Sequence, residues 1–407
     1  LTVLACVKHD AEITHIALDS REISMGGVFF AVAGTEQHGL LYAEKVKQQG
    51  AVAIVYDRAG QGRELAADIT GIALVAVENL AANLGCIAAR FYEYPARNLN
   101  IIGITGTNGK TSCSQFLAQA MDAGGVIGTL GWGRYSDLHS TLNTTPDAFS
   151  LQKILAHFYQ HDMTNVAMEV SSHGLEQGRV NAITFSGAVF NNLSRDHLDY
   201  HGSMEVYFQT KLRLLKWPGL RFIVVNLDDT YAERVIAAIT DEVRIITYSL
   251  QGKVHSTDSS LIASNICYTL AGIACDVVWQ EQRVKLTAGL LGDFNLQNIL
   301  AVLAVLLESG RELSECLLAI KDIKPVIGRM ECFSGGAGKP LVVVDYAHTP
   351  DALNKVLSTL RLHCAAQLNV VFGCGGDRDK GKRSEMAYIA EKFEARILVT
   401  DDNPRFE

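Results

Sequence analysis

The stretch TGTNGKTS, residues 105–112, decides the fold of this chain. It follows an apolar segment, residues 99–105, and precedes a helical pattern that contains Phe116. Glycines between a strand and a helix let backbone N–H groups surround phosphate oxygens at the helix N-terminus. The stretch therefore predicts a nucleotide-binding P-loop, in which Lys110 reaches the β- and γ-phosphates of ATP and Thr111 holds Mg²⁺.

The spacing of the loop departs from the usual P-loop in one detail. A glycine ordinarily stands five residues before the second glycine, and Ile104 occupies that position here, with Gly103 one residue away. An ordinary surface turn is the alternative for an isolated Gly-Lys-Thr, but the flanking strand and helix favour the P-loop. The residues predicted to contact ATP in this loop are Gly106, Thr107, Asn108, Gly109, Lys110, Thr111 and Ser112.

The composition limits the function classes. At about 150 residues per domain, 407 residues predict two or three domains. The chain has 36 basic and 44 acidic residues, a net charge of −8, so we expect no nucleic-acid partner, because phosphate neutralisation needs a basic surface. The longest apolar run, residues 299–307, is shorter than the roughly 18 residues of a spanning helix, so we expect no membrane span. Nine cysteines without a C-x-x-C pair support neither a zinc site nor a disulfide framework and indicate the reducing cytoplasm.

Apolar segments alternate with helical patterns in three successive regions, residues 1–97, 98–325 and 326–407. The predicted buried strands of the first two regions are 14–18, 27–32, 51–56, 99–105, 166–170, 187–190 and 222–226. Short apolar strands separated by helices indicate a parallel sheet with helices on both faces. The third region has the order strand (341–346), helix (350–362), strand (368–372), helix (383–393) and strand (396–400). We expect these strands to form one doubly wound sheet, which at three strands looks cut short.

Five further segments and the P-loop together resemble the motifs of the Mur ligase family. In chain order they are AMEVSSHGL (167–175), NLSRDHLDYHG (192–202), VDYAHTPD (344–351), GCGGDRDKGKR (373–383) and DNPR (402–405). The resemblance covers nearly the whole chain. It implies an α/β fold of three domains: a UDP-substrate-binding domain (1–97), a central ATP-binding domain with a P-loop parallel sheet (98–325), and a truncated Rossmann-like C-terminal domain that binds an amino acid (326–407).

The resemblance also implies the reaction, an ATP-dependent amide ligation in peptidoglycan synthesis. A substrate carboxylate attacks the γ-phosphate of ATP to give an acyl phosphate, and an incoming amine then displaces phosphate. Because phosphoryl transfer between anions depends on charge neutralisation, one Mg²⁺ near Thr111 and a second near the acyl site are expected. Glu169 and His197 match the family's ligands of the second metal ion. Hydrogen bonds that order a strand end and a loop are the alternative roles of these two residues.

Lys211 lies in an unusual position on a predicted helix, residues 204–215. Apolar side chains stand seven, four and three residues before it and four residues after it, so the lysine shares the apolar face of an amphipathic helix. A lysine on the solvated face would be ordinary. Desolvation favours the neutral amine, which is the form that reacts with carbon dioxide to give a carbamate. The position matches the family's carbamylated lysine, whose negative charge helps to hold Mg²⁺ and the acyl phosphate.

The remaining site residues are implied by the family motifs. Contacts to the UDP-linked substrate fall on Leu18, Ser20, Thr35, Glu36, Gln37, Asn143, Thr144, Thr145, Ser171, Gln177 and Arg179. Contacts near the adenine fall on Asn295, Asn298, Arg329 and Asp345. An ordinary turn at Ser20 and a helix cap at Asn295 are the alternatives. The implied partners of a monomeric chain are UDP-N-acetylmuramoyl-L-alanyl-D-glutamate, ATP and meso-diaminopimelate.

The amino-acid substrate is predicted from the DNPR motif. The residues implied to bind it are Arg378, Asp402, Asn403, Pro404 and Arg405. The planar fork of Arg405 suits the distal carboxylate of meso-diaminopimelate, which lysine lacks. A surface arginine after a turn-forming proline is the alternative reading of Arg405, and an L-lysine-adding ligase is the alternative function.

Two alternative functions would share part of this motif set. A non-catalytic nucleotide and UDP-sugar binding protein would have no need of Glu169, His197 and Lys211. A folylpolyglutamate synthetase shares the P-loop and the acyl phosphate but gives no reason for the first region or for the DNPR motif. Family members continue past that motif to a Gly-Lys-Gly-His-Glu segment. We therefore expect the chain ending at Glu407 to turn over very slowly or not at all.

Overall fold

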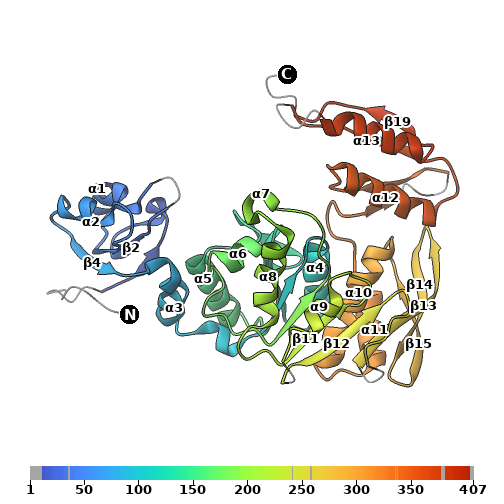
Figure 1. The fold of residues 1–407 in the computed structure, drawn as a ribbon, viewed down its shortest axis with the longest axis horizontal. Coiled ribbons are helices and arrows are strands. Elements are labelled where there is room, and N and C mark those ends of the chain that lie inside the picture. The colour runs from blue at the N-terminus through green and yellow to red at the C-terminus, as the bar shows by residue number, and fades with distance from the viewer. Residues whose placement is uncertain are drawn as a thin grey trace. The chain divides into compact units, whose positions relative to one another are not determined.

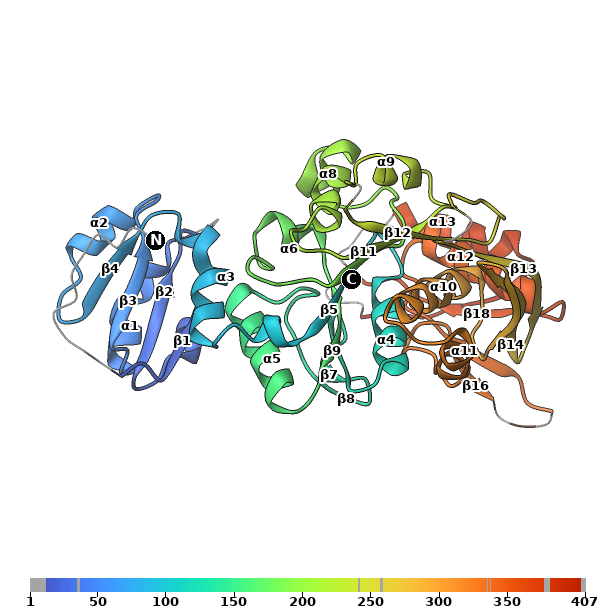
Figure 2. The same ribbon diagram turned by 90° about the horizontal axis from the view of Figure 1, so that it is seen from below.

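The computed structural model describes residues 12–34, 37–240, 242–256, 259–334, 336, 338–376 and 381–403 (Figures 1 and 2). The chain divides into two compact units. The first unit contains Leu1–Gly103, Gly125–Ser186 and His197–Leu220. The second contains Ile104–Gly124, Gly187–Asp196 and Arg221–Glu407, so the chain passes from one unit to the other five times, after residues 103, 124, 186, 196 and 220.

The N-terminal region forms a four-stranded parallel sheet in the order β1-β2-β3-β4. Its strands are β1 (His15–Ala17), β2 (Gly27–Ala31), β3 (Ala53–Asp57) and β4 (Ala73–Val77), and its helices are α1 (Ala43–Gln48), α2 (Gly62–Ala67), α3 (Leu80–Phe91) and the short 3₁₀ segments Ser20–Glu22, Gly39–Tyr42 and Pro95–Asn98. Alternation along β2 sends Phe29 and Val28 into two different apolar cores. Helices α1 and α2 cover one face of the sheet, and α3 covers the other (Figure 2).

A second sheet of eleven strands has the order β15-β14-β13-β12-β11-β10-β5-β9-β6-β7-β8. These strands are β5 (Asn100–Thr105), β6 (Gly124–Gly128), β7 (Gly131–Arg134), β8 (Asp137–His139), β9 (Asn165–Glu169), β10 (Gly187–Phe190), β11 (Phe222–Asn226), β12 (Arg244–Ser249), β13 (Ser260–Thr269), β14 (Gly272–Trp279) and β15 (Gln282–Ala288). Strands β10 to β13 are parallel, as predicted for this region. Both ends of the sheet are antiparallel, through β13-β14-β15 and β6-β7-β8, which the alternation of strands and helices did not predict.

The helices between these strands position the residues of interest. They are α4 (Lys110–Ala120), α5 (Ala148–Gln160), α6 (Ser172–Glu176), α7 (Leu198–His201), α8 (Met204–Leu215), α9 (Ala232–Ile236), α10 (Asp293–Glu308) and α11 (Leu313–Lys321). The longest apolar run of the sequence forms the buried part of α10, which packs against α4 and β11. No helix in the described part of the chain is both long enough and apolar enough to cross a membrane.

The C-terminal region contains two separate two-stranded sheets. Its elements are β16 (Glu331–Ser334), β17 (Leu341–Val344), α12 (Pro350–His363), β18 (Asn369–Phe372), α13 (Gly381–Lys392) and β19 (Arg396–Val399). The predicted strands and helices are present, but the expectation of a single three-stranded sheet is wrong. Strand β17 pairs antiparallel with β16, while β18 and β19 pair in parallel over a small core that includes Met386. The sequence pattern identified β17 correctly but did not reveal β16, the partner that takes up its hydrogen bonds.

Candidate active site

The P-loop residues form a closed turn at the start of α4 in the second unit. Gly109 has a positive φ of 81°, which glycine adopts without strain, and the helix begins at Lys110. The ammonium of Lys110 donates to the backbone oxygens of Gly106 at 2.8 Å and Thr107 at 3.0 Å. Helix α4 continues into a buried stretch that starts at Ser112. The predicted loop is thus a strand, a turn and a helix N-terminus, an arrangement that binds phosphates well.

The segment after β10 holds this loop in shape. The Thr107 N–H donates to the Asn192 carbonyl oxygen at 2.9 Å, and the Asn108 N–H donates to the Asn192 side chain at 2.8 Å. Asn192 returns a bond from its amide nitrogen to the Asn108 carbonyl at 3.1 Å. The Ser194 N–H donates to the Thr107 hydroxyl at 2.9 Å. The NLSRDHLDYHG motif therefore begins as a brace for the nucleotide loop.

Two asparagines close the loop from the other side. The Asn191 side chain donates to Asn298 Oδ1 at 3.2 Å, and both residues are buried. A Cβ at Gly109 would lie 2.7 Å from that same Asn298 oxygen, so only glycine fits there. Asn295 donates to the Leu291 carbonyl at 2.9 Å, while the N-cap of α10 is Gly292. Asn295 is therefore not a helix cap, and Asn298 lies directly beside the P-loop.

Arg329 and Asp345, the other predicted adenine contacts, lie together in the second unit. The Met330 N–H donates to Asp345 Oδ2 at 2.9 Å. Arg329 stacks over the Tyr346 ring, with its guanidinium carbon 4.8 Å from the ring centroid. Burial raises the pKa of Asp345 above its usual value, although the Met330 N–H and the Arg329 charge oppose this. Tyr346 is an aromatic neighbour that the sequence analysis did not identify as a site residue.

In the first unit, Glu169 is a completely buried carboxylate at the end of β9. It accepts hydrogen bonds from the Thr129 N–H at 2.9 Å and from the Thr129 hydroxyl at 3.1 Å. A Cβ at Gly128 would lie 2.0 Å from Glu169 Oε1, so only glycine fits at this position beside the carboxylate. Both of these bonds come from Thr129, which directly follows β6, so the carboxylate orders the end of that strand.

The predicted sugar and peptide contacts form a connected network around Thr145. The Thr145 hydroxyl donates to the Glu169 carbonyl oxygen at 2.9 Å, and the Ser171 N–H donates to that hydroxyl at 3.0 Å. Arg179 donates to the Thr145 carbonyl oxygen at 2.8 Å and to Gln177 Oε1 at 2.6 and 2.9 Å. The Thr144 hydroxyl lies 3.0 Å from that of Thr129, and Asn143, which is exposed, accepts at its carbonyl oxygen from Thr141.

Lys211 lies at the centre of an aromatic group built from α6, α7 and α8. It is 1% exposed, and its ammonium lies 4.6 Å from the centroid of the Tyr207 ring. Tyr207 is flanked by His201 at 5.2 Å and by His197 at 6.0 Å between ring centroids. His173 contacts His197 edge to face at 4.9 Å. The structure thus brings the predicted residues His197 and Lys211 together around one tyrosine.

Two histidines of this group, His173 and His201, have lowered pKa values. Burial lowers the pKa of His173, and the neighbouring His197 and His201 lower it further. Burial also lowers the pKa of His201, followed by the charges of His197 and Lys211. The buried His201 ring contacts the Ser172 hydroxyl at 2.9 Å. His173, His201 and Tyr207 were missed as site residues, although the first two stand in the quoted motifs and His201 follows His197 by one helical turn.

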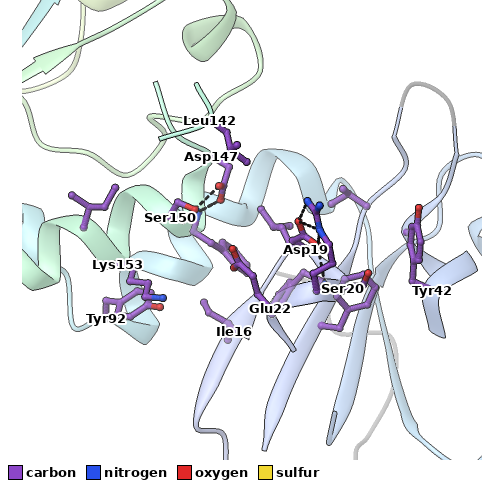
Figure 3. Close-up of a pocket in the computed structure, with 18 of the residues that line it drawn as sticks. Ile16, Asp19, Ser20, Glu22, Tyr42, Tyr92, Leu142, Asp147, Ser150 and Lys153 are labelled. Carbon is purple, nitrogen blue, oxygen red and sulfur yellow. Dashed lines mark hydrogen bonds and ion pairs between the residues drawn. The ribbon is translucent and has the colours of Figure 1, made fainter. Parts of the chain in front are cut away.

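A cavity of about 770 Å³ lies within the first unit (Figure 3). Its walls come from the β1–β2 region and from α5. They include Leu18 and Ser20, two of the predicted UDP contacts, together with Tyr42, Lys45 and Lys153. Gln37 does not line the cavity, but its amide donates to the Tyr42 hydroxyl at 2.6 Å. The wall formed by α5 and Trp132 was not predicted, because nothing in their local sequence marks a ligand.

The predicted amino-acid contacts are mostly outside the described residues. These are Arg378, Pro404 and Arg405, and the UDP contacts Thr35 and Glu36 are outside them as well. Asp402 and Asn403 are exposed, and the Asn403 carbonyl oxygen accepts from the Gly376 N–H at 3.1 Å. The GCGGDRDKGKR and DNPR motifs therefore meet at this hydrogen bond.

The donor chemistry of the predicted residues suits Mg²⁺ in part. Mg²⁺ prefers oxygen ligands, which Glu169 and the Thr111 hydroxyl supply. An ammonium on Lys211 would repel a cation, whereas a carbamate on it would supply two oxygens. Among the described residues, no group of three or more His, Cys, Asp and Glu side chains could hold a metal ion. The two predicted magnesium sites are not of that kind, because Thr111 would supply a hydroxyl to one ion and a carbamate on Lys211 would join Glu169 and His197 at the other.

The chain matches known protein families and individual relatives along nearly its whole length. Three family models match: "Mur ligase family, catalytic domain" over residues 12–92, "Mur ligase middle domain" over 104–306, and "Mur ligase, glutamate ligase domain" over 328–407. A UDP-N-acetylmuramoyl-L-alanyl-D-glutamate--2,6-diaminopimelate ligase of Pseudomonas aeruginosa is 49% identical over 98% of this chain and 81% of the relative. One of the same name from Pseudomonas putida is 45% identical over 100% of this chain and 82% of the relative.

Solved structures agree with these sequence matches. A structure with the same enzyme name has a TM-score of 0.76 at 33% identity and covers 98% of this chain and 82% of its own. MurF ligase from Thermotoga maritima in complex with ADP has a TM-score of 0.66 at 18% identity, over 95% of this chain and 88% of its own, and shows the shared fold alone. The P-loop with its asparagine braces, the predicted α/β architecture and the relatives that extend along the whole chain lead to one conclusion: the chain belongs to the Mur ligase family.

Proposed function

We propose that this Mur ligase uses ATP and Mg²⁺ to join meso-diaminopimelate to UDP-N-acetylmuramoyl-L-alanyl-D-glutamate. The relatives that are 45–49% identical to this chain are named UDP-N-acetylmuramoyl-L-alanyl-D-glutamate--2,6-diaminopimelate ligase. The observation that carries the ATP-dependent part is the P-loop, where Lys110 and the backbone N–H groups of α4 face a turn held by Asn192. A positively charged lysine at this helix N-terminus neutralises charge on a transferring phosphoryl group.

Glu169, His197 and Lys211 are proposed to serve the acyl-phosphate step. The neutral amine of Lys211 would add to carbon dioxide, forming an N–C bond and releasing one proton, and would leave a carbamate with one negative charge. The burial of Lys211 supports this proposal, because desolvation favours the neutral form of a lysine. Bound Mg²⁺ would stabilise charge on the phosphoryl oxygens. Glu169, fixed by Thr129, would orient that ion without a rearrangement of its own.

The cavity of the first unit is proposed to hold the UDP end of the substrate. Its lining includes the predicted contacts Leu18 and Ser20, and Lys45 lies 3.4 Å from the Ser20 hydroxyl. A volume of about 770 Å³ falls within the usual range of small-molecule sites. The domain boundaries at 97/98 and 325/326 stay predictions. So do a cytoplasmic location and a monomeric state, the latter testable by light scattering.

The choice of amino acid depends on Arg405. Diaminopimelate and lysine share a backbone end and a distal amine, and they differ in one distal carboxylate. A guanidinium binds a carboxylate through two parallel charge-assisted hydrogen bonds, and lysine would leave that fork unpaired. Such a site discriminates against the analogue by about 10⁴-fold.

Phosphate release with each amino acid tests this proposal. In a full-length protein with the UDP-linked dipeptide and ATP present, diaminopimelate should support turnover and lysine should not, and Arg405→Ala should remove most of the preference. Arg405→Lys, which keeps the charge but loses the fork, is the matched control and should retain only part of it. Equal efficiency with both amino acids would refute the assignment. Tight substrate binding with no phosphate release from ATP would instead favour a non-catalytic binding protein.

A further inference from the structure

His363, the last residue of α12, is buried and makes two hydrogen bonds to the main chain. Its Nε2 accepts from the Gly292 N–H at 2.9 Å. Its Nδ1 lies 2.7 Å from the Thr269 carbonyl oxygen. A backbone N–H only donates and a carbonyl only accepts, so these partners select one form of the ring, neutral with the proton on Nδ1. Through these two hydrogen bonds, His363 links α12 to β13 and to the start of α10.

The Gly292 end of this connection is the start of α10. Gly292 is the N-cap, with a positive φ of 91° and no side chain to cap the helix. A Cβ there would lie 2.4 Å from Thr359 Cγ2, which shows how closely α12 packs on this turn. The next residue, Asp293, accepts a short hydrogen bond from the Tyr268 hydroxyl. The N-terminal end of α10 is thus held by side chains from α12 and β13.

Further along α10, Asn298 lies beside the P-loop. Asn298 lies six residues after Gly292 on the same helix, a rise of about 9 Å. Its side chain contacts Asn191 and would touch any side chain at Gly109. A helix transmits a displacement along its length because its turns are hydrogen-bonded to one another. Movement of the Gly292 end therefore changes where Asn298 lies against the loop.

We propose that His363 is a positioning residue for nucleotide binding: it fixes the N-terminal end of α10 and, through that helix, the place of Asn298 beside the P-loop. The proposal rests on the proposed function only in taking ATP as the ligand of that loop. It gives the C-terminal region a part in ATP binding through a residue that does not touch the nucleotide.

Two substitutions separate the two hydrogen bonds. His363→Asn keeps a donor near the Nδ1 position and loses the acceptor for Gly292, whereas His363→Gln reaches the Nε2 position and keeps that acceptor. Hydrogen exchange of the Gly292 amide should be fast in His363→Asn and nearly as slow as in the unmodified chain in His363→Gln. The dissociation constant for Mg·ATP should rise about tenfold in His363→Asn, the factor that one buried hydrogen bond supplies, and less than twofold in His363→Gln. Affinity for the UDP-linked substrate should stay within twofold in both.

Thr359→Val is the matched control. Thr359 lies one turn earlier on α12, is buried to a similar degree and packs on the same glycine. Valine keeps that shape, so neither Gly292 exchange nor ATP affinity should change. An ATP affinity as weak in Thr359→Val as in His363→Asn would overturn the assignment to His363. Fast Gly292 exchange in His363→Asn with unchanged ATP affinity would overturn the coupling.

A measurement on the unmodified chain covers the case in which His363→Asn does not fold. Coupling between two sites is reciprocal, so ATP binding should slow exchange of the Gly292 amide. Unaltered exchange on saturation with Mg·ATP would overturn the proposal. A chain that bound no ATP would overturn both this proposal and the proposed function, whereas a failure to ligate diaminopimelate alone would overturn only the substrate assignment.

Discussion

Lys110 and Lys211 show two ways in which this molecule holds a lysine side chain. Lys110 lies partly exposed at the start of α4, and its ammonium is bonded to carbonyl oxygens three and four residues before it. Lys211 is buried, and its ammonium lies over a ring that belongs to the same helix but is flanked by histidines from other segments. The first environment is made by one short stretch of sequence. The second exists only after α6, α7 and α8 have packed.

The largest expected effect is the loss of phosphate release when the charge of Lys110 is removed. In a full-length protein, Lys110→Ala should reduce phosphate release from ATP by about 10³-fold or more, because the variant lacks the charge expected to face the transferring phosphoryl group. Lys110→Arg keeps the charge in a wider group, so its rate of phosphate release should lie between those of the unmodified protein and Lys110→Ala. The measurement is single-turnover acyl-phosphate formation. A loss smaller than tenfold in Lys110→Ala would show that the loop does not bind the reacting phosphate.

Lys211→Ala should cost less, about 10²-fold, and should respond to added acid in a way that Lys110→Ala does not. A short-chain carboxylate would occupy the space of the missing carbamate and restore part of the activity. The same acid should do nothing for Lys110→Ala, which is therefore the control. The measurement is turnover against acetate concentration. Equal rescue of both variants, or of neither, would contradict the predicted difference between the two lysines.

Asn192→Ala tests whether the brace of the P-loop matters. The Asn108 N–H would lose its acceptor, and we expect ATP affinity to fall by about five- to tenfold. Asn192→Asp keeps an acceptor for that N–H but loses the donor to the Asn108 carbonyl, so a smaller loss is expected. Calorimetric titration with Mg·ATP measures both. Identical affinities in all three proteins would mean that the loop keeps its shape without Asn192.

The smallest effect concerns pH and belongs to the region of Lys211. The pKa values of His173 and His201 are lowered in the folded chain, so the unfolded chain binds more protons in the interval below the ordinary histidine value of about 6.5. Stability from these two residues is therefore present above that value and is lost as the pH falls through the interval. The unfolding temperature should decrease between pH 7.5 and pH 5. It should decrease less in a His173→Asn, His201→Asn double variant. An equal decline in both proteins would assign the effect to other groups.

The parts of the structure that sequence could predict are those with a local cause. The predicted bounds of α8, β10 and β11 agree with the structure, because each carries an apolar pattern of the right period between clear ends. The β13-β14-β15 arrangement was not predicted, and the alternating burial along β13 becomes visible only in the folded chain. Pairing partners such as β16 depend on distant segments, which no local pattern reveals.

The candidate site divides in the same way. The glycines and Lys110 were predicted from one motif, and Asn298 from a second. His201 and Tyr207 were missed as neighbours of Lys211, because their contacts join helices whose packing the sequence does not specify. Tyr207 was noted only as part of an apolar row.

The repeated passage of the chain between its two units has a consequence for how the protein is made. A ribosome that has reached Asp196 has delivered α4 and β10 but has not yet synthesised β11, with which β10 pairs. Asn298 follows Gly109 by 189 residues, which at about 5–20 residues per second is roughly ten to forty seconds of synthesis. During that time the nascent nucleotide loop lacks the helix that closes it. Neither unit can therefore finish folding from a contiguous nascent segment, and early apolar strands must wait for partners that have not yet been synthesised.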